Sequence, residues 1–226
     1  MFMRNHPAVA ITFLALTLAT GAGVAQDNNI SLNDLKIRAD AGDKTATRQI
    51  AEAYYLGRDG VEQDFKLAAQ WYEKLAKQGD VRAQTSLGLI YARGYGVEKN
   101  LKLALKWLNL AAAQRDPGAQ YSLSTIYFRG DGIPQNLAES ARLRKEAAAR
   151  GHLQAQADLG SMYWDGKGVE KNLVLAYQWL GIAAQLGDDT APDTMKKVAA
   201  EMSSDQIREA AGYVKDWMEK NKKIRK

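Results

Sequence analysis

The chain has 226 residues, of which 46% are hydrophobic and 25% are charged, and its formal net charge is +5. This composition is typical of a globular protein, and the length allows a substantial apolar core. Because the sequence contains no cysteine, it excludes disulfides, zinc–thiolate sites and thiol catalysis.

The N-terminal segment differs in composition from the rest of the chain. Arg4 precedes the apolar run "AVAITFLALTLA" (8–19), and Gly23-Val24-Ala25 supplies the small residues that a signal peptidase recognises. The run is shorter than the roughly 20 apolar residues that cross a bilayer. We therefore predict an export signal over residues 1–25, cleaved before Gln26, and a periplasmic or secreted mature chain. An uncleaved N-terminal anchor is the alternative.

A short helix is predicted next, followed by a pattern with a period of 36 residues. Residues 26–42 include an amphipathic stretch, "SLNDLKIRADA" (31–41), which is typical of a capping helix. Tyr91, Tyr127 and Tyr163 then recur at equal spacing. The same spacing relates Ala83, Ala119 and Ala155; Leu87, Leu123 and Leu159; Gly94, Gly130 and Gly166; and Gly96, Gly132 and Gly168. We assign repeat 1 to residues 43–78, repeat 2 to 79–114, repeat 3 to 115–150 and repeat 4 to 151–187.

Each repeat is predicted to contain two helices joined by a glycine-containing loop. The loop "GYG" (94–96) follows no strand and precedes no Lys-Ser/Thr pair, so we interpret it as a bend and not as a phosphate-binding loop. The second helix starts after a residue whose side chain can cap the first-turn N–H groups. These residues are Asp64, Asn100, Asn136 and Asn172.

One position of the second helix carries a large residue in three repeats. Trp71, Trp107 and Trp179 occupy it, whereas repeat 3 has Leu143. A leucine still fills a core site, but it leaves part of the space of an indole empty. We therefore expect a void-prone spot at Leu143 and an intact stack of helices.

The repeat pattern resembles a known family. It is similar to the Sel-one-like repeat, a relative of the tetratricopeptide repeat. The similarity lies in the pattern A-x-x-x-L-G-x-x-Y-x-x-G-x-G-V, followed by a capped helix with A-x-x-W and a closing A-A-x-x-G. The resemblance covers about residues 43–187. It implies an all-α fold, a right-handed α-solenoid of four helix-turn-helix repeats with helical caps. It further implies that the first helix of each repeat lines a concave ligand-binding groove.

The C-terminal part is predicted to cap the solenoid and to end in a basic tail. In residues 188–219 we expect one helix from about 192 to 202 and a second after Ser203, which has capping-box spacing to Gln206. The tail "KNKKIRK" (220–226) holds five positive charges. Without these charges and that of Arg4, the formal net charge of the remaining residues is about −1. Nucleic acid binding requires a basic face on the fold itself and is not expected. The tail is a candidate for weak contact with an anionic envelope surface, and the oligomeric state is left open.

The sequence offers few groups for catalysis. His6 belongs to the predicted signal, which leaves His152 as the one histidine of the mature chain. Its spacing to other residues supplies no partners for a catalytic triad or a multi-histidine metal site. We predict no catalytic, cofactor-binding or metal-binding residues, and no enzyme activity.

A binding surface is predicted on the first helices, along the stripe opposite the motif residues. Aromatic residues edged by arginines are common anchors of protein recognition. The predicted partner-binding residues are Arg48, Tyr55, Arg82, Leu89, Arg93, Tyr121, Phe128, Arg129 and Trp164. We expect a partner protein or an extended peptide to bind there, unless the curvature of the solenoid or the terminal helices cover these side chains.

The sequence thus predicts a non-enzymatic periplasmic scaffold, as the resemblance implies for exported members, which are mostly adaptors, regulators or host-contact factors. Two alternatives stay open. Some cysteine-rich relatives bind or slowly hydrolyse β-lactams, but a disulfide staples each of their repeats and this chain has no cysteine. Binding of cell-wall polysaccharide through the aromatic residues and the basic tail is the other alternative.

Overall fold

The computed structural model describes residues 31–222, and this part of the chain is entirely helical, with eleven helices and no strand. The helices are α1 (Leu32–Asp40), α2 (Lys44–Leu56), α3 (Phe65–Lys77), α4 (Val81–Arg93), α5 (Leu101–Ala113), α6 (Pro117–Arg129), α7 (Leu137–Ala149), α8 (Leu153–Asp165), α9 (Leu173–Gln185), α10 (Ala191–Ala199) and α11 (Ser204–Lys220). They belong to one compact unit. The predicted export signal and residues 223–226 of the predicted tail lie outside the described residues.

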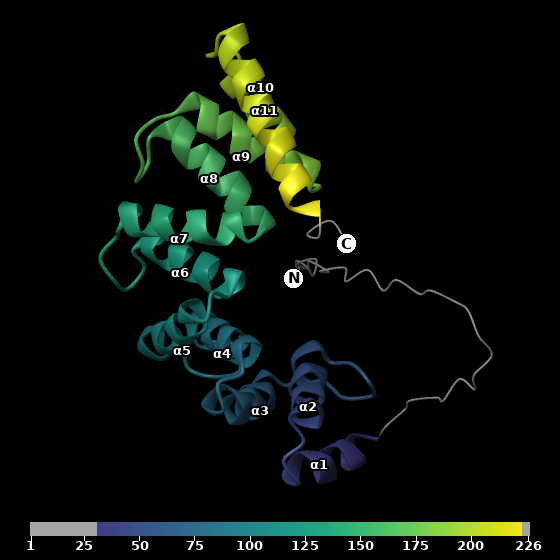
Figure 1. The fold of residues 1–226 in the computed structure, drawn as a ribbon. Helices are drawn as coiled ribbons and strands as arrows, with labels where there is room; N and C mark the ends of the chain where they lie inside the picture. The colour runs from purple at the N-terminus through teal and green to yellow at the C-terminus, as the bar shows by residue number, and fades with distance from the viewer. Residues whose placement is uncertain (1–30, 223–226) are drawn as a thin grey trace, which may run out of the picture. The chain divides into compact units, whose positions relative to one another are not determined.

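From α1 to α10, successive helices pack against one another in chain order (Figure 1). Four antiparallel pairs, α2 with α3, α4 with α5, α6 with α7 and α8 with α9, make the most extensive contacts. The second helix of each pair also packs against the first helix of the next pair. This arrangement confirms the predicted all-helical solenoid, in which each repeat is stabilised by its neighbours.

The helix starts follow from the capping residues. The predicted caps accept hydrogen bonds from the backbone N–H three residues later. For example, Asp64 accepts from the Leu67 N–H at 2.9 Å and Asn100 accepts from the Leu103 N–H at 3.0 Å. Asn136 and Asn172 make the same bond, as predicted. Each such cap stabilises a helix by about 1 kcal/mol, so these residues define where the second helices begin.

The glycine loops turn the chain between the two helices of a repeat, as the sequence predicts. Gly94 ends α4 with φ of +72° and Gly96 has φ of +61°, a left-handed conformation that glycine adopts without strain. A Cβ atom at Gly96 would lie 2.6 Å from the backbone nitrogen of Lys66. The loop therefore also needs glycine in order to pack closely on the start of α3 in the preceding repeat.

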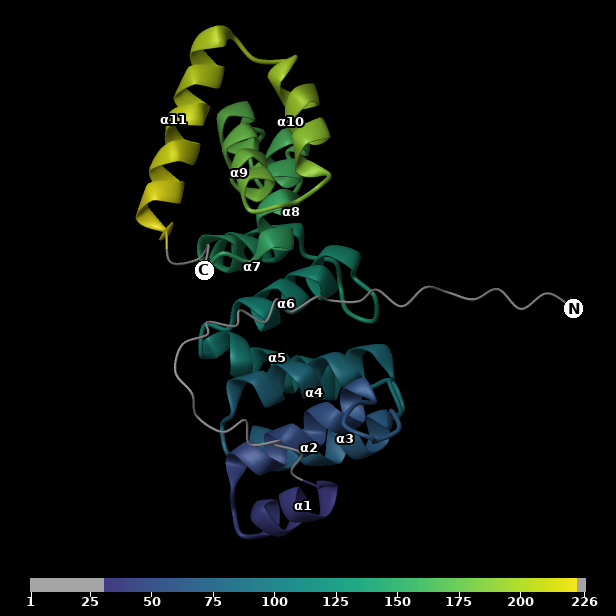
Figure 2. The same ribbon diagram turned by 90° about the vertical axis from the view of Figure 1, so that its right-hand side faces the viewer.

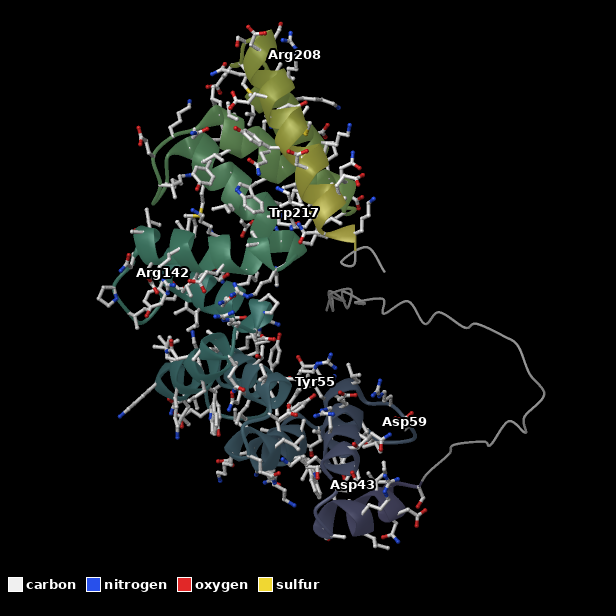
Figure 3. The ribbon with its side chains drawn as sticks, viewed as in Figure 1. Asp43, Tyr55, Asp59, Arg142, Arg208 and Trp217 are labelled. Carbon is white, nitrogen blue, oxygen red and sulfur yellow. The ribbon has the colours of Figure 1, made fainter. Side chains whose placement is uncertain are left out.

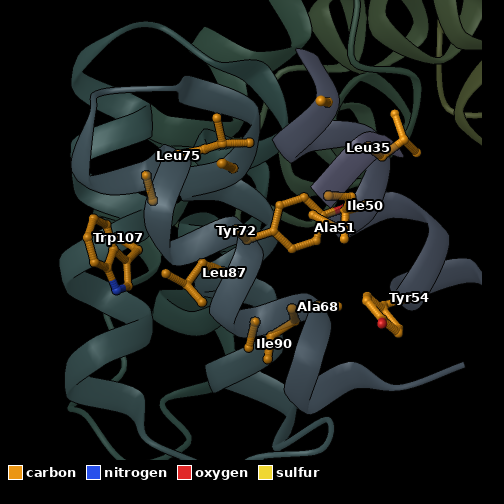
Figure 4. Packing of buried hydrophobic residues seen from close by; sticks show 14 residues of the cluster. Leu35, Ile50, Ala51, Tyr54, Ala68, Tyr72, Leu75, Leu87, Ile90 and Trp107 are labelled. Carbon is orange, nitrogen blue, oxygen red and sulfur yellow. The ribbon is translucent and has the colours of Figure 1, made fainter. Parts of the chain in front are cut away.

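The core consists of three hydrophobic clusters along the repeats and interlocks large with small residues. Figure 4 shows the indole of Trp107 beside Leu87, within a cluster that extends through Tyr72 to Ile50. Gly88 of α4 allows close approach of α5, because a Cβ atom there would lie 2.6 Å from Cγ of Leu108. Such complementary packing fixes the register of neighbouring helices.

Helices cover both ends of the stack. α1 packs against α2, and α10 and α11 both pack against α9, which they flank in Figure 2. Ser203 and Gln206 form the predicted capping box at the start of α11. The predicted helix over 192–202 is shorter in the structure, where α10 ends at Ala199. Between residues 31 and 222, none of the helices combines the length and the apolar character that crossing a membrane requires.

Candidate partner-binding site

The first helices of the four repeats, α2, α4, α6 and α8, are called the A helices below, and α3, α5, α7 and α9 the B helices. Every predicted partner-binding residue lies on an A helix. Arg82, Arg93 and Arg129 are exposed, and Leu89 is half-buried. Arg93 lies with its guanidinium 5.6 Å from the ring of Tyr95 in the following loop. These four positions are accessible to a partner.

One predicted position also connects neighbouring repeats. Arg48 forms an ion pair with Asp80, the residue that caps the next A helix. At the equivalent position of repeat 3, the ring of Tyr121 stacks on His152, which caps α8, with ring centroids 4.4 Å apart. Arg48 and Tyr121 therefore hold adjacent repeats together, whether or not they also contact a partner.

Two predicted aromatic residues pack against elements next to them. Tyr55, which projects from α2 in Figure 3, makes an edge-to-face contact with Phe65 at 5.3 Å. Trp164 donates a hydrogen bond from Nε1 to Glu201, which follows α10, at 2.6 Å. The C-terminal cap therefore contacts Trp164. Both rings are only half-buried, so each keeps an accessible edge.

Phe128 lines a cavity between α6, α7 and α8 with a volume of about 260 Å³. Asp158, Ser161, Met162, Asp165 and Lys167 of α8 and the following loop also line it, together with Arg144 of α7. The Arg144 guanidinium lies 4.6 Å from the centroid of the Phe128 ring, in cation–π geometry. We call this cavity the Phe128 pocket.

Arg144 is a charged residue in a core position. Its side chain is 6% exposed, and its ion pair with Asp158 is long, at 3.4 Å. Its Nη1 donates to the sulfur of Met162 at 3.0 Å, a weak acceptor, and its Nε is buried with no acceptor within residues 31–222. The positive charge beside the Phe128 pocket is therefore incompletely compensated, which is unusual for a buried arginine.

The sequence analysis did not single out Arg144. The signal was present, because Arg144 stands 36 residues after Leu108 and 36 before Leu180, and both leucines are buried. Core packing alone does not explain a cation at a position where the neighbouring repeats have an apolar residue.

The titratable groups of this region take part in contacts between repeats. Burial, followed by the charge of Asp158, raises the pKa of Tyr121 to about 12, so the phenol stays protonated and donates to Asp158 at 3.1 Å. Burial lowers the pKa of His152, although the carboxylates of Asp116 and Asp158 act in the opposite direction. The Nδ1 of His152 accepts a hydrogen bond from the Ala155 N–H at 3.3 Å, so the imidazole serves as a helix cap. In the described part of the chain, no three His, Asp or Glu residues are grouped as a metal would require.

Comparison with protein families identifies the repeats. The model of the Sel1 repeat matches residues 45–80, 81–116, 117–152 and 153–188, each starting two residues later than the predicted repeat. A further match over residues 8–33 overlaps the predicted export signal and lies almost wholly outside the described residues. The resemblance stated from the sequence is therefore confirmed. None of the curated proteins compared with the chain matches it.

Two solved structures are similar to this chain. The first is c5321 of uropathogenic Escherichia coli, described as a protective antigen with an SLR fold, with 29% identity, a TM-score of 0.78 and coverage of 86% of this chain and 42% of that protein. The second is a Sel1 repeat protein of Oxalobacter formigenes, with 32% identity, a TM-score of 0.67 and coverage of 76% of this chain and 49% of that protein. The chain thus spans less than half of the length of each.

Proposed function

Because the chain belongs to the Sel1 repeat family, whose members are generally protein–protein interaction scaffolds, we propose that it binds a partner protein or peptide on the exposed side of its A helices. Members of the family are typically non-enzymatic, and we propose the same for this chain. The proposed centre of the contact is the Phe128 pocket.

The observation that carries this proposal is the incomplete pairing of Arg144. A guanidinium forms strong hydrogen bonds to carboxylate and carbonyl oxygens, and its burial is costly when such acceptors are missing. An oxygen atom of a bound partner would supply a better acceptor than the Met162 sulfur at 3.0 Å. The ring of Phe128 adds an apolar surface next to the charge, a combination common in the centre of protein interfaces.

The exposed residues around the pocket extend this surface. Arg129 lies next to Phe128 on α6, and Lys167 forms an ion pair with Asp165 at 2.7 Å at the other side of the pocket. Leu89 and Arg93 of α4 present the corresponding stripe of repeat 2. A partner that follows the A helices would therefore meet a partly apolar surface with cations at its edge.

The test is capture of partners from an envelope extract with a variant that fills the pocket. Ser161→Arg places a long side chain in the Phe128 pocket and leaves Phe128 and Arg144 in place. Gln185→Arg, at an exposed position of the B helix α9, is the matched control with the same change of charge. We expect the wild type and Gln185→Arg to capture the same protein and Ser161→Arg to lose it. Equal capture by both variants, with unchanged circular dichroism, would refute the A-helix site.

We also propose that the protein is exported and acts in the periplasm or outside the cell. The apolar run after Arg4 and the small residues before Gln26 support this proposal. N-terminal sequencing of the protein from fractionated cells tests it. A mature chain that starts at Gln26 in the periplasmic fraction is expected, and an intact N-terminus in the cytoplasmic fraction would contradict it.

A further inference from the structure

Repeat 3 contains a second and larger cavity, which shares no lining residue with the Phe128 pocket. It lies between α5, α6 and α7 and has a volume of about 640 Å³. Ala112, Leu123 and Leu143 form its apolar walls. We call it the Leu143 cavity.

The repeat spacing relates this cavity to the place of an indole. Leu143 stands 36 residues after Trp107 and 36 before Trp179, and both indoles are buried. Leu123 of the cavity wall corresponds to Leu87, which lies beside Trp107 in Figure 4. Repeat 3 therefore keeps Leu123 in the wall but supplies a smaller side chain, at the spot where the sequence predicts a void.

The Leu143 cavity also contains an unpaired hydrogen-bond acceptor. Gln120 is 1% exposed and donates from Nε2 to Glu146 at 2.7 Å, but its Oε1 accepts no bond from any residue between 31 and 222. In repeat 4 the Oε1 of Gln156 is likewise buried with no donor among the described residues. In repeat 2, by contrast, the equivalent Oε1 of Gln84 accepts a bond from Gln114 at 2.9 Å.

A substitution between repeats explains this difference. The counterpart of Gln114 in repeat 3 is Arg150, which donates instead to the Glu146 carbonyl at 2.8 Å. A buried acceptor without a donor is unfavourable, so a ligand that brings an N–H group would be stabilised at Gln120.

The edge of the cavity is positively charged. Arg142, labelled in Figure 3, is balanced by ion pairs with Glu139 and Glu146. Arg115 and Arg150 also line the cavity, and neither forms an ion pair within the described chain. Acidic groups beside the ligand would therefore be attracted to this edge.

We propose that the Leu143 cavity binds a tryptophan side chain from an acidic segment of a partner protein, at the place where the other repeats insert their own indole. The apolar walls accept the ring, Gln120 accepts the indole N–H, and Arg115 and Arg150 attract the flanking carboxylates. This contact is independent of the Phe128 pocket, so it would be a second anchor for a partner.

The test uses the purified full chain and a blocked peptide, Asp-Glu-Trp-Glu-Asp, as the probe. Methyl NMR spectra should show saturable shifts of Leu123 and Leu143 on titration. We expect the peptide with Ala in place of Trp to bind at least about tenfold more weakly, since a buried aromatic anchor carries most of the affinity of a small contact. A peptide with Asn and Gln in place of Asp and Glu should lose the salt dependence of binding.

Two variants of the protein locate the site. Leu143→Trp should fill the cavity, abolish binding of the peptide and raise the Tm by roughly 2–4 °C. Leu110→Trp, at an exposed position of α5 outside the cavity, is the control and should bind as the wild type does. Arg115→Gly restores the residue of the other repeats, preserves the fold and should weaken binding only at low salt.

Several results would overturn the proposal. These are no binding of the peptide at millimolar concentration, equal binding of the Trp and Ala peptides, and methyl shifts at Met162 of the Phe128 pocket in place of Leu143. If Leu143→Trp fails to fold, the location of the NMR shifts and the effect of Arg115→Gly still decide the question. Failure of this contact leaves the A-helix proposal untouched, because Ser161→Arg reports on a different cavity.

Discussion

Arg144 and the residue that faces it, Ser124, provide the sharpest test of the packing described above. In repeats 2 and 4 the corresponding pairs are Gly88 with Leu108 and Gly160 with Leu180. A Cβ atom at Gly160 would lie 2.7 Å from Cγ of Leu180, so a branched leucine requires a glycine opposite. In repeat 3 the serine has a Cβ atom, and the arginine has no branch at Cγ. The two residues are therefore expected to depend on each other energetically.

The expected changes in the free energy of unfolding are worked out for the two single variants and for the double variant. Arg144→Leu alone would drive Cγ against the Ser124 Cβ, and overpacking of this kind costs about 1–3 kcal/mol. Ser124→Gly alone would lose roughly 0.5 kcal/mol of helix propensity and leave a small void. The double variant restores the pair of the other repeats and removes an incompletely paired buried cation, which is neutral or stabilising by up to about 4 kcal/mol. We expect it to be at least as stable as the wild type.

The assay is urea unfolding followed by circular dichroism for the four proteins of this cycle, with equal m-values as the condition for comparing free energies. The coupling free energy between positions 124 and 144 should be about 1–3 kcal/mol in favour of the double variant. Ser122→Gly combined with Arg144→Leu is the control, because Ser122 lies on α6 and bonds to the Gly118 carbonyl. Additivity within about 0.5 kcal/mol for the Ser124 cycle would refute the reasoning.

Two further predictions concern a cap and a loop. Since the pKa of His152 is lowered on folding, the unfolded chain binds more protons, so the free energy of unfolding should fall as the pH decreases below about 6.5. His152→Asn keeps a capping side chain and should reduce the loss of unfolding free energy between pH 7.5 and 5.5, measured by urea unfolding. An unchanged loss in this variant would show that His152 is not its cause. Gly96→Ala should destabilise the protein more than Gly187→Ala does. Both variants should lose about 1–2 kcal/mol of unfolding free energy because alanine disfavours the left-handed backbone. Of the two positions, only Gly96 would bring a Cβ atom within 3 Å of backbone atoms. Equal losses in the two variants would show that the loop can adjust.

Much of the fold was predictable because the repeat carries its information locally. Asn100 and its counterparts cap the second helices, and glycines such as Gly94 supply the left-handed residues of the turns. These signals act within a few residues, so a single sequence reveals them. The 36-residue period indicates that one unit recurs, and the resemblance of that unit to the Sel-one-like repeat implied the solenoid without any long-range contact being known.

The site was less predictable because its features depend on contacts between repeats. Whether Trp164 is free depends on Glu201, which lies 37 residues later and after two further helices. Tyr121 looks like a ligand-facing aromatic from its helical position, but it stacks on the cap of the next A helix. The assignment of these residues to a partner-binding surface therefore stays a prediction. Arg144 was missed because the sequence analysis considered only the first helices as a binding surface, and Arg144 lies on a second helix.

Two departures of repeat 3 from the pattern of its neighbours lie at adjacent positions. Leu143 in place of tryptophan opens one cavity, and Arg144 in place of leucine places a charge beside another. In a solenoid, stability is approximately a sum over repeats and the interfaces between neighbours, so an unfavourable change in one repeat has a local cost. Repeats 2 and 4 keep the regular Gly–Leu and tryptophan packing on either side. A central repeat supported in this way can keep an unfilled cavity and an incompletely paired arginine without loss of the fold. For this reason, we place both proposed contacts in repeat 3.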